Sequence, residues 1–260
     1  MSTSFDPIAQ NYDANFTDTS IGREQREIVH TFLNMQIPAP ADILEINCGT
    51  GEDALKLATD GHSVLFTDAS PVMVELAMQK TERVRSLAAG RVWDLRTPFP
   101  GDEKFDVIFS DFGGLNCLSP EELRKLSQQL AALLPNKGQI FAVVMGRKCW
   151  WERLYFLMTG KFRKIFRRSQ KKPVTARLNA ATTLPIWYYS PGEFARLFSK
   201  EFTAKPAQPV GFFIPPSYLE NKAKKFPGIF QLLVRCERLI SRMSFFADRA
   251  DHYFIALEKR

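Results

Sequence analysis

The chain has 260 residues, of which 45% are hydrophobic and 24% are charged. This composition is close to the globular average and argues against disorder. Its four cysteines are far apart and form no C-x-x-C pair, so neither a disulfide framework nor a zinc site is expected. The sequence contains no apolar run of 18 residues and no secretory-signal pattern at its start. We therefore expect a cytoplasmic protein with a buried core and no membrane-spanning helix.

The net charge of +7 is concentrated in one segment. Between Arg147 and Lys172, ten Lys or Arg residues accompany a single acid, Glu152. The rest of the chain is therefore slightly acidic, and the basicity belongs to one patch of the surface.

Short apolar runs rich in β-formers alternate with helical patterns from residue 42 onward. This order predicts an α/β fold that is doubly wound, with a mostly parallel seven-stranded sheet and helices on both faces. Strands are expected at 42–46, 63–67, 91–93, 105–109, 139–145 and 253–257. Helices are expected at 53–59, 72–88, 120–134 and 191–198, the last two beginning with Ser-Pro capping sequences.

Two parts of the chain fall outside this alternation. Residues 1–35 predict a helical lead-in, and residues 147–187 predict a helical insertion after the fifth strand. We expect a single domain over residues 1–260, with a cofactor-binding core at 36–146 and the C-terminal part of the sheet at 188–260.

The carboxyl ends of the expected strands carry glycines and acids. Ligands of open parallel sheets bind beyond these ends. Gly49 and Gly51 follow the first strand and permit a tight turn with close ligand approach. Asp68 ends the second strand and suits two hydrogen bonds to a ribose, and Asp94 ends the third. An acid after a strand is often only a helix N-cap, but this combination favours a ligand that contains adenosine.

An NAD-binding oxidoreductase is the obvious alternative, because residues 49–54 satisfy G-x-G-x-x-A. Two observations disfavour it. Asn47 and Cys48 separate the strand from the first glycine. Glu52 and Asp53 occupy the helix N-terminus at which a pyrophosphate would bind, and they would repel it. The charges favour an adenosyl cofactor without phosphates.

The segment Leu44-Glu45-x-Asn-Cys-Gly-Thr-Gly51 resembles motif I of class I (Rossmann-like) S-adenosylmethionine-dependent methyltransferases. Residues 61–73 resemble the next strand with its ribose acid. The lead-in Phe5-Asp-x-x-Ala-x-x-Tyr12-Asp13 resembles the N-terminal segment of many small-molecule methyltransferases. The likeness covers roughly residues 5–145, and 253–259 resembles the closing strand.

The resemblance implies a role toward S-adenosyl-L-methionine for each matching residue. Gly49 and Gly51 would pass beneath its methionine portion, Glu45 would organise the turn near its amino group, and Asp68 would hold its ribose. Asn47 departs from the usual glycine, tolerates positive φ and would add a hydrogen bond. The remaining implied contacts are Ala69, Met73, Asp94 and Leu95 with the adenine, Ser110 and Phe112 with the methionine side, Tyr12 as a cover and Arg26 with the carboxylate.

Methyl transfer from a sulfonium is an in-line displacement in which positioning supplies much of the acceleration. A general base is required only if the acceptor must lose a proton. The candidates are Asp111, which follows the fourth strand, and His252, which precedes the closing strand. His30 is expected to be an ordinary helix residue, and no metal site is expected.

The insertion gives the clearest indication of the substrate. Residues 150–158 form a broad apolar helical face, and Phe162, Ile165 and Phe166 repeat at helical spacing among lysines and arginines. Three interpretations remain open: a cap over the active site, a helix lying in a membrane interface, or a surface that binds nucleic acid phosphates. The first two are compatible, and they would allow peripheral contact through residues 147–172 at the inner membrane face.

We expect the acceptor to be an apolar small molecule of aromatic, polyketide or isoprenoid-like type, since the chain holds 22 Phe. RNA methylation through the basic insertion is the alternative. The sequence Ser110-Asp-Phe-Gly-Gly lacks the Asn/Asp-Pro-Pro-aromatic pattern typical of enzymes that methylate base amino groups. A nucleic acid partner is therefore disfavoured, and no obligate protein partner is expected.

Overall fold

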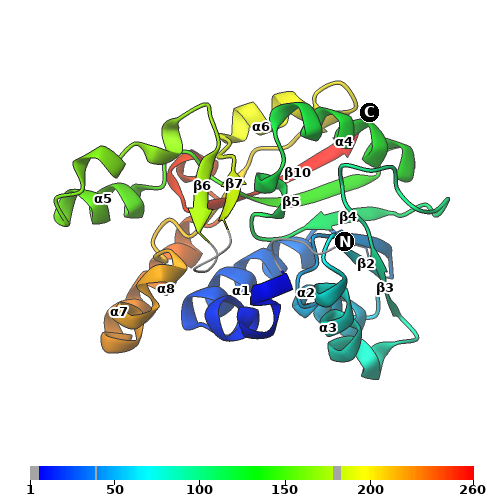
Figure 1. Cartoon of the computed structure of the whole chain (residues 1–260), viewed down its shortest axis with the longest axis horizontal. Helices are drawn as coiled ribbons and strands as arrows, with labels where there is room; N and C mark the ends of the chain where they lie inside the picture. Colours follow the sequence, from blue (N-terminus) through cyan, green and yellow to red (C-terminus); the bar gives the residue numbers. More distant parts are fainter. Residues whose placement is uncertain (1–5, 39, 178–182) are drawn as a thin grey trace.

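The computed structural model describes residues 6–38, 40–177 and 183–260. Phe5 of the lead-in motif and residues 178–182 of the insertion lie outside the described residues. The described chain forms a mixed α/β structure around one large sheet, with helices on both of its sides (Figure 1).

The large sheet has eight strands in the order β3-β2-β1-β4-β5-β10-β8, and β9 also pairs with β10. Neighbours from β3 to β5 are parallel, whereas β10 is antiparallel to β5, β8 and β9. The strands are β1 (Asp42–Ile46), β2 (Ser63–Asp68), β3 (Ala88–Val92), β4 (Val107–Ser110), β5 (Gln139–Met145), β8 (Phe202–Ala204), β9 (Gln208–Val210) and β10 (His252–Lys259). Since β8 and β9 pair with opposite ends of β10, they share the seventh strand position. The interruption between them contains Pro206, which has no N–H to donate.

Helices cover both faces of this sheet, as expected for a doubly wound fold. The helices of the described chain are α1 (Ser20–Asn34), α2 (Glu52–Thr59), α3 (Pro71–Thr81), α4 (Pro120–Leu133), α5 (Trp150–Met158), α6 (Pro191–Phe198), α7 (Glu220–Lys225) and α8 (Pro227–Ile240). Successive strand residues face opposite sides. Ile43 accordingly belongs to the core formed with α1, α2, α3 and α8, whereas Leu44 belongs to the core formed with α4 and α6.

One expected helix is shorter than its pattern indicates. The prediction placed it at residues 72–88, but α3 ends at Thr81, whose Oγ1 donates to the Ala77 carbonyl at 2.8 Å. A 3₁₀ turn at Glu82–Val84 then leads into β3, which begins at Ala88 rather than at Arg91. Pairing with β2 outweighs the helix preference of the alanines in this segment.

The insertion after β5 is only partly helical, so the prediction of a helical insertion was incomplete. Gly160, with φ of 68°, follows α5, and residues 161–169 form two 3₁₀ turns instead of an amphipathic helix. A separate hairpin of β6 (Val174–Arg177) and β7 (Thr183–Ile186) completes it. Its basic side chains are not all solvated, because Arg167 and Arg168 both bind the buried Glu152 at 2.7 and 2.9 Å.

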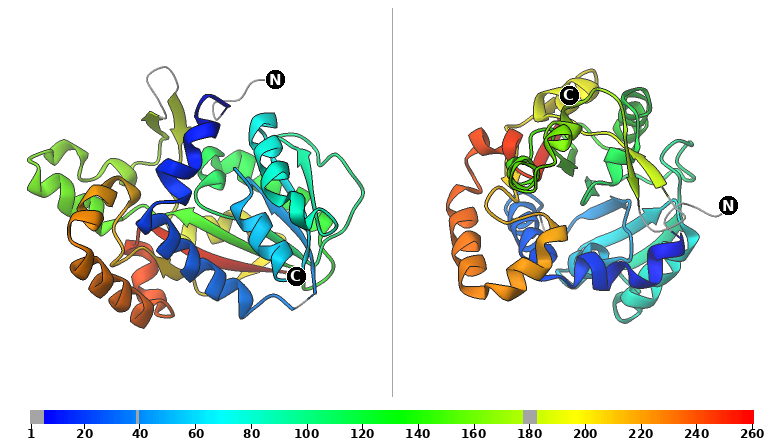
Figure 2. Two further views of the ribbon diagram at one scale, coloured as in Figure 1. Left: turned by 90° about the horizontal axis from the view of Figure 1, so that it is seen from below. Right: turned by 60° about the vertical axis from the view of Figure 1, so that its left-hand side comes forward.

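The helices α7 and α8 lie between β9 and β10 and were not predicted from the sequence. The buried Glu237 of α8 accepts hydrogen bonds from the four backbone N–H groups of residues 211–214. The α7–α8 pair lies at the same end of the molecule as α5, beside the end of β5 (Figures 1 and 2). Within the described residues, no helix is both long enough and apolar enough to cross a membrane.

Candidate active site

The turn after β1 is built from residues with positive φ. Asn47, Gly49 and Gly51 have φ of 58°, 53° and 79°, so Asn47 adopts the conformation expected of it. A Cβ on Gly51 would lie 2.8 Å from the Ala77 Cα, which excludes any larger residue there. A Cβ on Gly49 would lie 3.8 Å from Tyr12 Cε1, so this tyrosine of the lead-in covers the glycine turn.

Asn47 also connects this turn to the end of β4. Its Nδ2 donates to the Oγ of Ser110 at 2.9 Å. A Cβ on Gly114 would lie 2.4 Å from the Asn47 side chain, so the second glycine turn packs directly against Asn47. These contacts hold the ends of β1 and β4 together.

Asp68 connects the glycine turn to the start of α3. Its Oδ2 accepts from the Gly49 N–H at 3.1 Å, and its Oδ1 accepts from the Ser70 N–H at 2.9 Å. Burial raises the pKa of Asp68 to about 6, although these backbone donors oppose the shift. Ala69 and Met73 follow at once, and Met73 is buried in α3.

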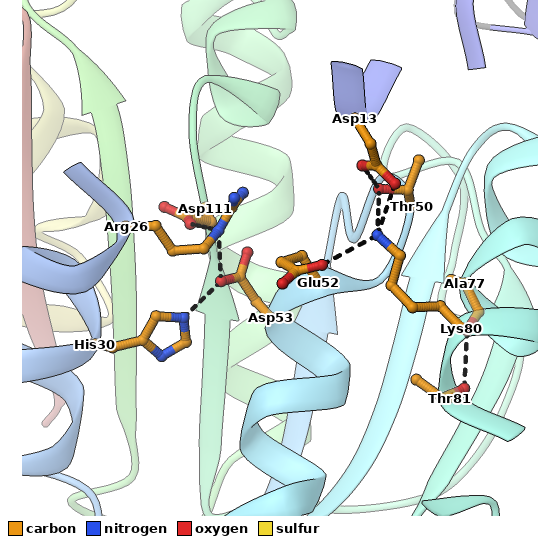
Figure 3. Close-up of polar contacts among 10 residues, drawn as sticks. All are labelled: Asp13, Arg26, His30, Thr50, Glu52, Asp53, Ala77, Lys80, Thr81 and Asp111. Carbon is orange, nitrogen blue, oxygen red and sulfur yellow. Dashed lines mark hydrogen bonds and ion pairs between the residues drawn. The ribbon is translucent and has the colours of Figure 1, made fainter. Parts of the chain in front are cut away.

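A network of buried ionisable groups lies beside the turn (Figure 3). The Nε of Arg26 is 3.0 Å from Asp53 Oδ1 and 3.7 Å from Asp111 Oδ2. His30 Nε2 lies 2.8 Å from the same oxygen of Asp53. Burial would raise the pKa of Asp53, but Arg26 and His30 outweigh it and lower the pKa. Burial and the neighbouring Asp53 raise the pKa of Asp111 well above its ordinary value.

Glu45, at the end of β1, is a further buried acid of this group. Its side chain is 1% exposed, and its Oε2 has no hydrogen-bond partner among the described residues. Burial, followed by repulsion from Asp53 and Asp111, raises the pKa of Glu45 well above its ordinary value. The raised pKa values of Glu45, Asp68 and Asp111 show that nearby cations do not compensate for the burial of their charged forms, so a cationic ligand would stabilise these carboxylates. An ammonium group beside Glu45 would satisfy its unpaired oxygen.

The two catalytic candidates both contact Phe112. The backbone N–H of Phe112 donates to Asp111 Oδ1 at 2.9 Å. The ring of His252 packs edge-on against the Phe112 ring, with centroids 5.3 Å apart. The Arg26 guanidinium lies over the same ring at 5.5 Å. Asp111 thus contacts the backbone of Phe112, whereas His252 and Arg26 contact its ring.

A second polar cluster ties the lead-in to the glycine turn. Lys80 Nζ contacts Asp13 Oδ2 at 2.8 Å, Glu52 Oε2 at 3.1 Å and Thr50 Oγ1 at 3.2 Å (Figure 3). Burial raises the pKa of Tyr12 to about 12, so its hydroxyl stays protonated at neutral pH. Lys80 was not singled out from the sequence, because a lysine on a helix is ordinarily solvated.

Asp94 and Leu95 are the predicted residues with the weakest structural link to this turn. The Asp94 carboxylate is 44% exposed and accepts from the N–H and Nη1 of Arg96 at 3.0 and 3.3 Å. Leu95 is buried in the core on the α4 side of the sheet. Within the described residues, no group of acids, histidines or cysteines could hold a metal ion.

The sequence interpretation missed His30 and Asp53 as members of the site. His30 was expected to be an ordinary helix residue, and Asp53 was considered only for its charge at the start of α2. Both are buried, at 5% and 3% exposure. The available signal was the spacing of Arg26 and His30, because residues four apart lie on one helix face.

Residues 43–138 match the protein family described as a methyltransferase domain. The chain is 28% identical over 233 residues to the demethylmenaquinone methyltransferase of Bacillus licheniformis, covering 88% of this chain and 82% of that relative. It is 30% identical over 139 residues to the demethylmenaquinone methyltransferase of Lactiplantibacillus plantarum, and this match covers 50% of this chain and 56% of that relative. The chain thus matches little more than half the length of this relative. The solved complex of DhpI with SAH shares the fold, with a TM-score of 0.64 at 14% identity over 98% of this chain and 93% of DhpI.

The glycine turn, the acids at three strand ends and the sheet order agree with these matches. The cofactor is S-adenosyl-L-methionine, which sets aside the NAD-binding alternative. Residues 43–138 therefore form a methyltransferase domain, within a sheet that has the Rossmann-like fold of S-adenosylmethionine-dependent methyltransferases.

Proposed function

We propose that the acids around the glycine turn bind the cofactor in the way that its chemistry requires. In this proposal, Glu45 accepts from its amino group and Asp68 accepts from its ribose hydroxyls. Arg26, which pairs with Asp53, binds its carboxylate. Asn47 adds a polar contact beside the turn. The other proposed contacts are Gly49, Gly51, Tyr12, Ser110 and Phe112 on the methionine side, and Ala69, Met73, Asp94 and Leu95 around the adenine.

The methyl acceptor is an apolar small molecule of aromatic, polyketide or isoprenoid-like type. The observation that carries this proposal is the ring of Phe112, which contacts both Arg26 and His252 just after β4. An aromatic wall favours stacking with an apolar ring. Both relatives are demethylmenaquinone methyltransferases, so a quinol is the first acceptor to test. Residues 147–187 serve as a cap within a single domain.

When bound, the cofactor supplies an electrophilic methyl group. The chain positions the acceptor and, for a hydroxyl or acidic C–H acceptor, removes its proton. Asp111 is the proposed base, because its Oδ2 makes no hydrogen bond among the described residues, and burial and the neighbouring Asp53 raise its pKa well above the ordinary value. His252 is the second candidate, and its Nδ1 lies 3.4 Å from Asp251.

The test uses cofactor labelled in its methyl group with two acceptors, a demethylated naphthoquinol bearing a short isoprenoid tail and bulk tRNA. We expect label in the organic-soluble quinone. Asp111→Asn should lower this transfer by about 100-fold or more, whereas its SAH dissociation constant should change far less. Asp102→Asn, at an exposed loop position, is the matched control.

Two results would contradict the proposal. Label that enters tRNA and not the quinol would restore RNA methylation as the function. Asp111→Asn with the turnover of the Asp102→Asn control would remove Asp111 as the base. The corresponding measurement on His252→Gln would then show whether the histidine takes that role.

A further inference from the structure

Helix α8 carries apolar side chains on two faces. One face packs inward through Phe230 and Val234. Ile229, Leu232 and Leu239 point outward and are 60%, 59% and 81% exposed. A helix at the surface of a globular protein needs only one apolar face to join its core. The outward face is therefore not explained by folding.

Cations flank this outward face. Lys222, Lys225 and Arg235 are exposed, and none forms an ion pair with an acid in the described part of the chain. Lys225 lies over the exposed ring of Phe226, 5.7 Å from its centroid. The nearby acids are already engaged: Glu220 accepts from the N-terminal N–H groups of α1, and Glu237 is buried.

The segment after α5 has the same character. Met158, Phe162 and Phe166 are 77%, 63% and 61% exposed. Lys161, Arg163 and Lys164 lie among them, and they too form no ion pair within the described residues.

This segment and α7–α8 belong to one end of the molecule. The rings of Tyr155 in α5 and Tyr218, just before α7, lie 5.5 Å apart. Trp151 Nε1 donates to the carbonyl of Phe213 at 3.0 Å. Figures 1 and 2 show both segments projecting from the same side of the sheet.

We propose that the exposed apolar and basic side chains of residues 157–166 and 222–239, the docking face, bind the surface of a bilayer that contains anionic phospholipid. Apolar side chains enter the boundary between headgroups and acyl chains while cations attract the anionic headgroups. A second copy of the chain fits this face poorly, because an isologous contact would oppose cations to cations. Nucleic acid would use the cations but leave the large apolar side chains in water.

The docking face lies near the proposed site of the acceptor. His252, which packs on Phe112, pairs with Met145 at the end of β5, and the insertion begins two residues later. A bilayer held at the docking face would therefore lie on the side of the molecule from which the insertion leaves the sheet. The relation to the acceptor rests on the proposed function, but the docking face itself does not.

The test is sedimentation of the whole chain with vesicles of phosphatidylcholine alone, or of phosphatidylcholine with about 30% phosphatidylglycerol, in 0.1 M salt. Neither cofactor nor acceptor is present, so the outcome is independent of the methylation assay. We expect pelleting with the anionic vesicles only. Lys222→Gln/Lys225→Gln should lower the partition coefficient by about 30-fold, since each lysine near such a surface contributes about 1 kcal/mol.

Ile229→Ser/Leu232→Ser should lower partitioning by about 10-fold or more without any change of charge. Lys125→Gln/Lys200→Gln is the charge-matched control, since both lysines are exposed and lie in α4 and just after α6, on the sheet face opposite to α8. This variant should bind within about twofold of the wild type. A retained thermal shift with SAH shows that each variant is folded.

Three results would overturn the proposal. The wild type could remain in solution with anionic vesicles, or all variants could pellet like the control. Alternatively, the wild type could be a dimer that Ile229→Ser/Leu232→Ser dissociates while vesicles are ignored. That result would make this surface a contact between copies of the chain.

Discussion

Lowering the pH should weaken cofactor binding through protonation of Asp68. Burial raises the pKa of this carboxyl to about 6, and only the ionised form accepts from both ribose hydroxyls. Affinity is therefore complete above pH 6 and is lost as the pH falls through 6. A single group with this pKa weakens the apparent dissociation constant by about 11-fold between pH 8 and pH 5, or about 1.4 kcal/mol. Glu45 and Asp111, whose pKa values are also raised, act in the same direction.

The assay is calorimetric titration of SAH at pH 8 and pH 5 for the wild type and Asp68→Asn. At each pH, the ratio of the Asp68→Asn dissociation constant to the wild-type dissociation constant isolates the contribution of Asp68, because the other acids are common to both proteins. We expect Asp68→Asn to weaken binding about tenfold more at pH 8 than at pH 5. Asp102→Asn, at an exposed position, should show the pH profile of the wild type. If the ratio of the Asp68→Asn dissociation constant to the wild-type dissociation constant is the same at pH 8 and pH 5, protonation of Asp68 does not weaken cofactor binding.

The structure also predicts three effects on stability, each measurable by urea unfolding. Glu237→Ala should lower the free energy of unfolding by about 3 kcal/mol or more, because it leaves the N–H groups of residues 211–214 unsatisfied, and Glu237→Gln should cost less. Asn47→Ala should cost about 1–2 kcal/mol at its φ of 58°, and Asn47→Gly should be tolerated better. Glu152→Gln should cost about 3 kcal/mol, because Glu152 is the buried partner of two arginines, whereas the exposed Glu121→Gln should cost under about 0.5 kcal/mol. Equal losses of unfolding free energy for Glu237→Ala and Glu237→Gln, for Asn47→Ala and Asn47→Gly, or for Glu152→Gln and Glu121→Gln would contradict these assignments.

Local signals were sufficient for most of the sheet and its helices. β5 and α6 have the bounds that their apolar patterns and caps predict, residues 139–145 and 191–198. Their signals lie within the segments themselves, in strand-forming runs and in the Ser-Pro start of α6. The last edge of the sheet gave no such signal, because β8 and β9 have three residues each and are interrupted near Pro206.

The structural features that the sequence did not predict depend on tertiary contacts. Residues 161–169 have helical spacing, but Arg167 and Arg168 reach back to Glu152, and this pairing accompanies two 3₁₀ turns. The burial of His30 depends on the packing of α1 against the start of α2, where it meets Asp53. Neither partner is visible in a local pattern. The glycine turn, in contrast, could be predicted because positive φ restricts the residue types in the turn itself.

The most direct test of the account is the thermal unfolding midpoint of the chain with SAH, with NAD and without ligand. A ligand at about 100 times its dissociation constant adds about 2.7 kcal/mol to the free energy of unfolding. This corresponds to a rise of about 5–10 °C in the unfolding midpoint for a chain of this size. We expect this rise with SAH, no rise with NAD, and a smaller rise with SAH for Asp68→Ala. A rise with NAD instead, or no rise with either ligand, would contradict the assignment of the glycine turn and of the cofactor.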